Sequence, residues 1–168
     1  MLFRSPLVDA CNAVALCAVL PVAAYDRHLI HGDLVVRLAR GTEEFVPLGG
    51  GPVEHPQPGE VVYTDGVVTP GEPSGGGRAL SRRWNWRQAD GAKVTAATRQ
   101  ALITIEGVYG IERAVVEEAA ADLGILIGSA WGCGVAAAVL TTERPAADLV
   151  DDMRDREDAC FVPRIPSP

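Results

Sequence analysis

The sequence predicts a single α+β domain. Its 168 residues and 17.7 kDa are the size of one ordinary domain, and two separate cores would each have little apolar surface to bury. Hydrophobic residues make up 48% of the chain and charged residues 22%, which argues against a coiled coil or wholesale disorder. Apolar residues recur at helical spacing at the start of the chain and again after residue 110, and the stretch between them holds short β-rich runs separated by glycine and proline.

The first predicted element is an amphipathic helix over residues 6–20. Its apolar positions repeat every three or four residues, and Pro21 ends it. Asp9 and Asn12 then share one face of the helix. A Gly/Pro-rich insert over residues 68–78 has the composition of a flexible loop that joins two strands. The predicted strands cover residues 34–38, 45–48, 61–63, 79–84 and 100–106.

The strongest helical pattern covers residues 111–127, with the acidic residues of this segment exposed. A turn at residues 131–133 and a β-rich piece at 135–140 follow. The side expected to be buried carries Ile111, Val115, Ala119, Leu123 and Leu126.

The C-terminal part of the chain differs in composition from the rest. We assign residues 1–142 to the domain and 143–168 to a charged C-terminal segment with a Pro-rich tail. Within that segment, residues 144–158 are expected to form a surface helix. The tail over residues 163–168 is expected to fray.

The net charge of −7 and the pI near 4.9 exclude a generic polyanion-binding protein, whose whole surface would be positive. The cysteines are far apart and include no C-x-x-C pair, which disfavours a zinc knuckle or a disulfide-dense scaffold. We expect reduced and buried thiols. The cysteines are Cys11, Cys17, Cys133 and Cys160.

Two apolar stretches imitate targeting or membrane segments. Arg4 precedes an apolar run that ends in small residues, as in a secretory signal, but Asp9 and Asn12 interrupt it. Residues 123–142 are long enough to span a bilayer, but Gly128, Gly132 and Gly134 divide them. A cytoplasmic protein with no membrane contact is therefore expected.

A local basic cluster lies within residues 78–99. This window carries +5 and leaves −12 for the rest of the chain. Together with Trp84 and Trp86 it could neutralise phosphate and stack an unpaired base or ribose, as proteins that bind single-stranded RNA ends do. The alternative is cation–π packing between strands without a ligand. The cations are Arg78, Arg82, Arg83, Arg87, Lys93 and Arg99.

Glu106 ends an otherwise apolar strand. A carboxylate there is unfavourable unless it meets a donor. That donor is either a hydroxyl or ammonium group of a substrate, or an arginine of the chain in a structural salt bridge.

No metal and no cofactor are expected. His28 and His31 lie near carboxylates, but no third ligand motif accompanies them. The glycine runs at 49–51 and 75–77 are not followed by the Lys-Ser/Thr pair of a phosphate loop, and Ser129 lacks the G-x-S-x-G context of a hydrolase nucleophile.

A set of motifs occurs in the order typical of one known family. Together they resemble the stand-alone relatives of the phenylalanyl-tRNA synthetase β-chain editing domain, called the B3/B4 domain, over residues 8–108. The run Arg-Arg-Trp-Asn-Trp-Arg-Gln is the most specific of them. The motifs are residues 7–14, Pro21, Tyr25-Asp26, residues 32–37, residues 82–88, Thr98 and Ile105-Glu106-Gly107.

This resemblance implies a mixed sheet with flanking helices and a pocket for the aminoacylated 3′ end of tRNA. In the synthetase, the domain hydrolyses tyrosine wrongly attached to phenylalanine tRNA. Glu106 occupies the place of the glutamate that recognises the tyrosine hydroxyl, and Cys11 and Asn12 lie in the helix segment that lines the pocket. Asn85 and Trp86 are further pocket candidates by position, and Glu106, Asn12 and Asn85 are expected to converge on one cavity.

The function implied is that of a trans-acting editing factor, in which Arg82, Arg83 and Arg87 bind phosphate and water hydrolyses the ester. Ala23 stands where the synthetase has a histidine between its proline and its Phe-Asp pair. The loss of this acid–base side chain favours an alternative, a non-catalytic module that binds tRNA, an amino acid or a protein partner. A third alternative is a remnant whose tryptophans and arginines only pack inside the protein.

Overall fold

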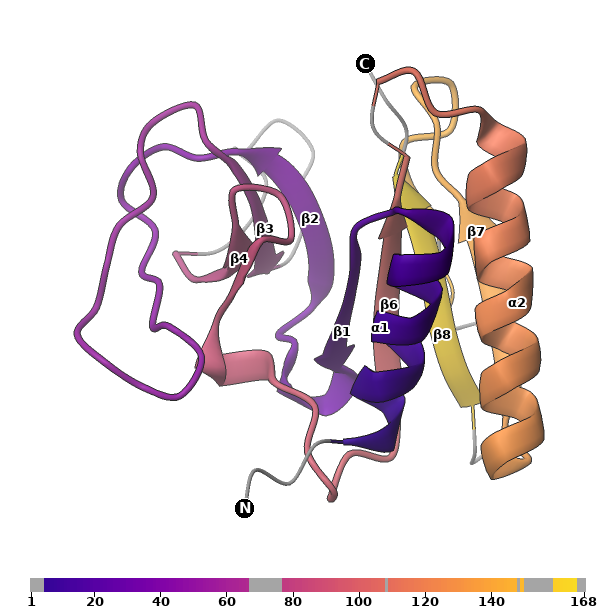
Figure 1. The fold of residues 1–168 in the computed structure, drawn as a ribbon. Coiled ribbons are helices and arrows are strands. Elements are labelled where there is room, and N and C mark those ends of the chain that lie inside the picture. The colour runs from indigo at the N-terminus through magenta and orange to yellow at the C-terminus, as the bar shows by residue number, and fades with distance from the viewer. Residues whose placement is uncertain (1–4, 67–76, 108, 148, 150–158, 166–168) are drawn as a thin grey trace. The chain divides into compact units, whose positions relative to one another are not determined.

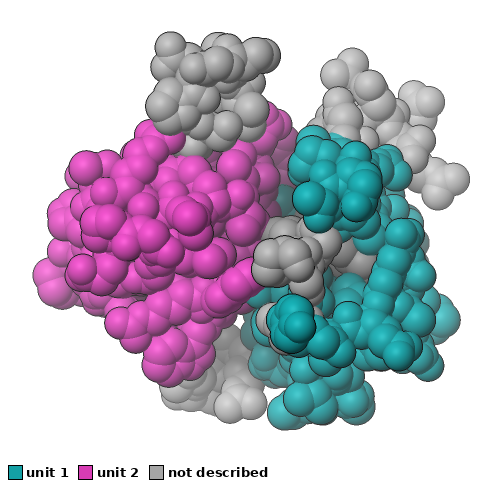
Figure 2. Space-filling model, turned by 90° about the horizontal axis from the view of Figure 1, so that it is seen from above, with its two compact units in different colours: residues 1–24, 94–168 teal, residues 25–93 magenta. Residues whose placement is uncertain are grey.

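The computed structural model (Figure 1) describes residues 5–66, 77–107, 109–147, 149 and 159–165. The chain divides into two compact units, which Figure 2 shows in different colours. Unit 1 consists of residues 1–24 and 94–168, and unit 2 of residues 25–93. Two four-stranded sheets and two α-helices occur within the described residues. The predicted α+β class is confirmed.

The sheet of unit 1 is mixed, as the family resemblance implied. β8 pairs in parallel with both β6 and β7, and β1 runs opposite to β6 in Figure 1. The strand order is β1-β6-β8-β7. The strands are β1 (Val22–Asp26), β6 (Ala101–Glu106), β7 (Gly134–Val139) and β8 (Ala159–Ile165).

Helices α1 (Pro6–Ala18) and α2 (Arg113–Trp131) pack on the same face of β6. Side chains alternate along a strand, and Ala101, Ile103 and Ile105 share one buried cluster with both helices. Residues 102, 104 and 106 therefore point to the other face of the sheet, where they are also buried.

The ends of the two helices follow from local sequence. Proline stands in the first turn of α1, where its missing N–H has no helical partner in any case. α1 ends at Ala18, and the residue after it, Val19, takes a left-handed φ of 53°. α2 ends at Gly132 with φ 65°, and the Gly132 N–H donates to the Gly128 carbonyl at 2.9 Å. Glycine adopts this conformation without steric strain.

Unit 2 contains an antiparallel sheet in the order β2-β3-β4-β5. Tyr25, Tyr63 and Leu80 are fully buried in this unit. The strands are β2 (Asp33–Leu38), β3 (Val61–Gly66), β4 (Ala79–Arg82) and β5 (Arg87–Gln88), and two 3-10 helices lie at Arg27–Leu29 and Asp90–Ala92.

The long connection from β2 to β3 is organised around Glu43, which is 1% exposed. Its carboxylate accepts hydrogen bonds from the Arg37 guanidinium and from the backbone N–H groups of Arg40 and Gly41. Burial alone would raise the pKa of Glu43, but the hydrogen bonds from Arg40 and Arg37 outweigh it and lower the pKa to about 2.

The prediction that the Pro-rich tail frays is wrong for residues 163–165. These residues belong to β8, where Pro163 pairs with Ala138 of β7 and Ile165 with Glu106 of β6. Pairing with two neighbouring strands is a tertiary effect, which the composition of the tail does not reveal. The surface helix expected over residues 144–158 is not present at residues 144–147 and 149, and its other residues lie outside the described part of the chain.

The predicted strand at residues 45–48 is also wrong. Phe45 and Pro47 form isolated bridges, to Glu54 and Ala89 respectively. Proline cannot donate to a strand ladder, and a turn at residues 48–49 follows it, closed by the Gly50 N–H, which donates to the Pro47 carbonyl at 2.9 Å. The insert at 68–78 joins β3 to β4, as predicted, but its residues 68–76 lie outside the described part of the chain.

The buried side of α2 agrees with the prediction at Ala119 and Leu123 and differs from it at the other predicted positions. The structure buries Val116, Ala119, Ala120, Leu123 and Ile127. Val115 and Leu126 are instead 37% and 40% exposed. Two apolar stripes lie side by side on this helix, and the buried one includes a pair of alanines whose small side chains allow close packing.

No helix in the described part of the chain is both long enough and apolar enough to span a membrane. The apolar segment 123–142 is instead the end of α2, a turn at Gly132 and strand β7, which agrees with the division expected from its glycines.

Candidate functional site

The turn between β4 and β5, residues 83–86, holds two consecutive residues in left-handed conformation. Arg83 has φ 52° and Trp84 has φ 60°, values that non-glycine residues adopt infrequently. Each such residue costs about 1 kcal/mol or more and persists only where contacts with the surrounding structure compensate for this cost. The turn was predicted as part of a strand that ends at Trp84, but β4 ends at Arg82.

A group of hydrogen bonds beneath the turn stabilises this backbone conformation. The Tyr25 hydroxyl lies 2.7 Å from Asn85 Oδ1 and 3.0 Å from Ser81 Oγ. Ser81 Oγ also lies 3.0 Å from Asn85 Oδ1 and 3.1 Å from the Trp84 carbonyl. Because Asn85 Oδ1 faces two hydroxyl groups, the amide is held with its oxygen toward them and its NH₂ group on the opposite side.

The turn presents an aromatic surface with a cation beside it. Trp86 is 76% exposed, and the Arg83 guanidinium carbon lies 5.6 Å from the centre of its ring. Within the described residues, no carboxylate lies within ion-pair distance of Arg83. An exposed indole and an exposed guanidinium can stack a planar group and attract an anion. Trp84 is also exposed, at 39%.

Arg82 and Arg87, the other two arginines expected to bind phosphate, are held by carboxylates of the same unit. Arg82 is 4% exposed and donates to both oxygens of Glu60 at 2.8 and 2.9 Å. Arg87 donates to both oxygens of Glu54 at 2.6 and 2.8 Å, and Arg82 also reaches Glu54 at 2.8 Å. Both guanidinium groups lie over the ring of Phe45, at 5.5 and 5.2 Å.

These contacts lower the pKa of both acids. The hydrogen bond from Arg82 holds the pKa of Glu60 down at about 2, and the hydrogen bond from Arg87 lowers the pKa of Glu54. Both carboxylates therefore stay ionised at neutral pH. This geometry supports the structural alternative for Arg82 and Arg87, whereas Arg83 remains available to a ligand.

The remaining cations of the basic cluster also have partners within the protein. Arg78 forms an ion pair with Asp65 and donates to the Leu29 carbonyl. Lys93 binds Asp90 at 2.8 Å, and Arg99 donates to backbone carbonyls. The positive charge that the sequence places in this segment is thus largely neutralised.

Glu106 is the last residue of β6 and is 1% exposed. Its backbone N–H donates to the Pro21 carbonyl at 3.0 Å, which ties the end of β6 to the start of β1. The next residue is Gly107, where a Cβ would lie 2.9 Å from Val116 Cγ2. Glycine therefore allows α2 to pack close to this strand end.

Cys11 and Asn12 lie on α1, and their environments differ. Cys11 is 3% exposed and belongs to the cluster between the helices and β6, whereas Asn12 is exposed to solvent. The side chain of Glu106 points to the opposite face of the sheet from that cluster. Ala23, in β1, is buried and offers no acid–base group.

His28 and His31 have structural contacts. The His28 N–H donates to Asp26, which caps a 3-10 helix, and the His31 N–H donates to Asp65 at 2.9 Å. Among the described residues, no group of three or more histidines, cysteines or acids has a geometry that could hold a metal ion.

Tyr25 and Ser81 are not among the site residues expected from the sequence, although they support the turn. They stand 56 residues apart, and no local pattern connects them. Tyr25 does belong to one of the motifs on which the family resemblance rests, and this is the signal that could have identified it.

Comparison with known proteins finds one family model, described as B3/4 domain, that matches residues 1–125. No curated protein matches the chain. The matched residues include the β4–β5 turn, its support at Tyr25 and the buried carboxylate of Glu106.

Proposed function

The chain belongs to the B3/4 domain family, a domain found in the phenylalanyl-tRNA synthetase β chain, and we propose that it binds the aminoacylated 3′ end of tRNA and hydrolyses mischarged aminoacyl-tRNA in trans. The observation that carries this proposal is the exposed pair of Trp86 and Arg83 on a turn that buried hydrogen bonds hold in place.

The nucleotide contacts are assigned to this turn. Trp86 stacks an unpaired base of the 3′ end, an interaction of about 1–3 kcal/mol per base. Arg83 binds the adjacent phosphate, and the fixed NH₂ group of Asn85 donates to an acceptor on the nucleotide. Arg82 and Arg87 contribute indirectly, because their ion pairs with Glu54 and Glu60 hold the strands on either side of the turn.

The amino acid is recognised by Glu106, whose buried carboxylate favours a substrate that donates a hydrogen bond. In the reaction, water attacks the carbonyl carbon of the ester. The bond between this carbon and the ribose oxygen breaks, and the water proton passes to that oxygen. The products are a free amino acid and tRNA with an intact terminal hydroxyl. An aminoacyl ester is reactive enough that positioning the water lowers the barrier by several kcal/mol.

The second candidate function is a non-catalytic module that binds the same RNA end. The identity of residue 23 favours it, since alanine stands where the synthetase has a histidine. Both candidates use the same nucleotide contacts, and they differ in whether the ester is broken.

A deacylation assay with a panel of mischarged tRNAs distinguishes the two functions. The editing function predicts faster release of free amino acid from at least one of them. Glu106→Gln keeps the size of the side chain but removes its charge, and it should change which amino acid is released fastest. Glu112→Gln, an exposed acid, is the matched control and should leave release unchanged. Binding without release from any tRNA would favour the non-catalytic module.

A further inference from the structure

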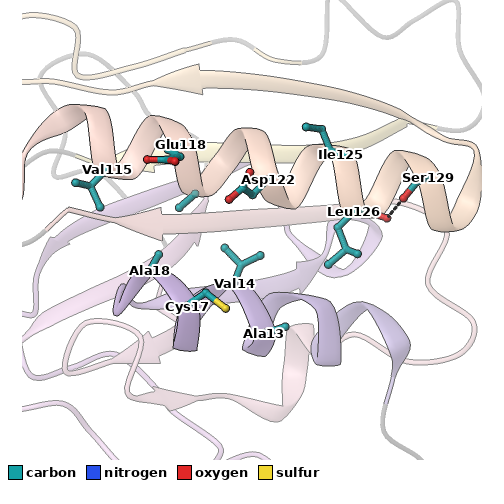
Figure 3. Close-up of a pocket in the computed structure, with 11 residues that line it drawn as sticks. Ala13, Val14, Cys17, Ala18, Val115, Glu118, Asp122, Ile125, Leu126 and Ser129 are labelled. Carbon is teal, nitrogen blue, oxygen red and sulfur yellow. Dashed lines mark hydrogen bonds between the residues drawn. The ribbon is translucent and has the colours of Figure 1, made fainter.

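An open groove of about 650 Å³ lies between α1 and α2 within unit 1 (Figure 3). Val14 on α1 and Leu126 on α2 both point into the space between the two helices. Its floor and walls are mainly apolar, and the Ser129 hydroxyl at one end donates to the Leu126 carbonyl at 3.0 Å. This groove plays no part in the function proposed above.

Large apolar side chains on both helices are exposed to solvent. On α2, three of these side chains line the groove: Ile125 is 70% exposed, Leu126 40% and Val115 37%. On α1, Leu16 is 80% exposed but does not line the groove. Exposed apolar side chains grouped in a groove mark an interaction site. A groove between two helices accommodates the apolar face of a third helix.

The charge of this surface is negative. Glu118 and Asp122 line the groove one helical turn apart, and neither forms an ion pair with the described residues. α1 contains no Lys or Arg, and Arg113 of α2 is bound to Glu117 at 2.9 Å. Like charges at this spacing repel each other, so a ligand with positive charge would relieve the repulsion.

We infer that the groove between α1 and α2 is the docking site for a basic amphipathic helix of a partner protein. The apolar stripe of such a helix would cover Val14, Leu126 and Ile125, and its Lys or Arg side chains would lie beside Glu118 and Asp122. A second copy of this chain is disfavoured as the occupant, because it would bring the same carboxylates to a surface that already carries them.

The groove sets the length of the partner helix. The residues that line it on α2 run from Val115 to Ser129, a distance of about 21 Å at 1.5 Å per residue. A helix of about 14 residues covers this length. The probe is therefore a synthetic peptide of leucine and lysine of that length, with leucine at positions that form one helical stripe. A permuted peptide of the same composition, without the stripe, controls for attraction to an acidic protein.

Cys17 provides the readout, because it lines the groove and, contrary to the prediction that all thiols are buried, is exposed. The alkylation rate of Cys17 by iodoacetamide is measured by mass spectrometry of proteolytic fragments. The striped peptide should slow this rate about fivefold or more, and Cys133, which does not line the groove, should react as before. The permuted peptide should leave both rates unchanged.

Variants test which groove residues bind the peptide. Glu118→Gln combined with Asp122→Asn should weaken binding about fivefold, as expected for the loss of two exposed charge pairs. Leu126→Asp should abolish protection of Cys17. Glu112→Gln removes a charge outside the groove and should leave the affinity unchanged.

Three results would overturn the inference. The first is equal protection of Cys17 by both peptides, and the second is unchanged affinity in the variant that lacks both carboxylates. The third is a concentration-dependent dimer in sedimentation experiments that Leu126→Asp dissociates, since a second copy would then occupy the groove. None of these results bears on tRNA deacylation.

Discussion

At the scale of single residues, unit 2 depends on carboxylates that are ionised and bound. Glu43 binds the Arg37 guanidinium and two backbone N–H groups of its own loop, and Glu60 binds Arg82 in a bidentate pair. Both pKa values are lowered to about 2 from an ordinary value of 4.5. A lowered pKa in the folded protein means that protonation favours the unfolded chain.

The first prediction at the scale of residues concerns the loss of folding stability at low pH. The stabilisation from Glu43 and Glu60 is complete above their unfolded pKa of 4.5 and is lost as the pH falls toward about 2. Between pH 5 and pH 3 the free energy of unfolding should fall by about 2 kcal/mol for each of these carboxylates. Urea unfolding followed by circular dichroism at several pH values measures this loss.

Substitution distinguishes the contribution of Glu43 to stability from the contributions of other acidic residues. At pH 7, Glu43→Gln should lower the free energy of unfolding by about 3 kcal/mol, because Arg37 is left without its charged partner. The same variant should show a shallower loss of stability in acid. Glu44→Gln alters the exposed neighbour and should change neither quantity. A wild-type stability that is constant from pH 5 to pH 3 would contradict this account.

At the scale of elements, the β4–β5 turn combines strain with support. Arg83 and Trp84 adopt left-handed φ values, and the hydrogen bonds among Tyr25, Ser81 and Asn85 hold them there. Strain that the surroundings maintain is found where the conformation serves a function. In this turn, Trp86 is exposed and the Arg83 guanidinium lies over its ring.

The second prediction, at this scale, is that Tyr25 positions the turn without touching RNA. Tyr25 is fully buried, and Tyr25→Phe removes its hydroxyl while keeping the ring that packs 6.1 Å from that of Tyr63. Loss of about 1 kcal/mol of hydrogen bonding should weaken binding of a tRNA 3′ end about fivefold and accelerate hydrogen exchange in the turn. Tyr109→Phe, at an exposed position, is the control. Unchanged binding and exchange in Tyr25→Phe would contradict the positioning role.

The sequence predicts elements well where the signal is local. Apolar spacing and Pro21 mark α1, and the glycines after residue 127 mark the end of α2 and the start of β7. β1 and β8 escape prediction because their pairing partners are distant in sequence, such as Glu106 for Ile165. For the same reason, only part of the site could be predicted. The motif at residues 82–88 identifies the turn, but its buried support includes Tyr25, which is distant in sequence.

For the arginines of the basic cluster, the charge of the sequence alone does not predict which of them are available to a ligand. Sequence separation hides the contacts of Arg82 and Arg87 with Glu54 and Glu60, which lie 22 to 33 residues away. The cluster therefore has the composition of a phosphate-binding surface, although most of its charge is neutralised within unit 2. Arg83 differs because, within the described residues, it forms no ion pair with either acid, although its charge helps to lower the pKa of both.

At the scale of the whole molecule, the chain carries −7 and most cations of its basic segment are paired with acids. The proposed binding of RNA would then depend on stacking by Trp86 and on the charge of Arg83 more than on overall charge. Glu106 belongs to unit 1, and Asn85 and Trp86 belong to unit 2. Their convergence on one pocket stays a prediction, as does the division of the chain at residue 142.

The most direct test compares the affinity of the protein for uncharged tRNA that has its unpaired 3′ nucleotides and for tRNA that lacks them. The account predicts that removal of these nucleotides weakens binding about tenfold, and that Trp86→Ala weakens binding of the intact tRNA to a similar extent. Removal of the nucleotides and Trp86→Ala in combination should weaken binding little more than either change alone. Trp131→Ala on α2 should leave the affinity unchanged. Equal affinity for both tRNAs, or an intact-tRNA affinity that Trp86→Ala leaves unchanged, would contradict it.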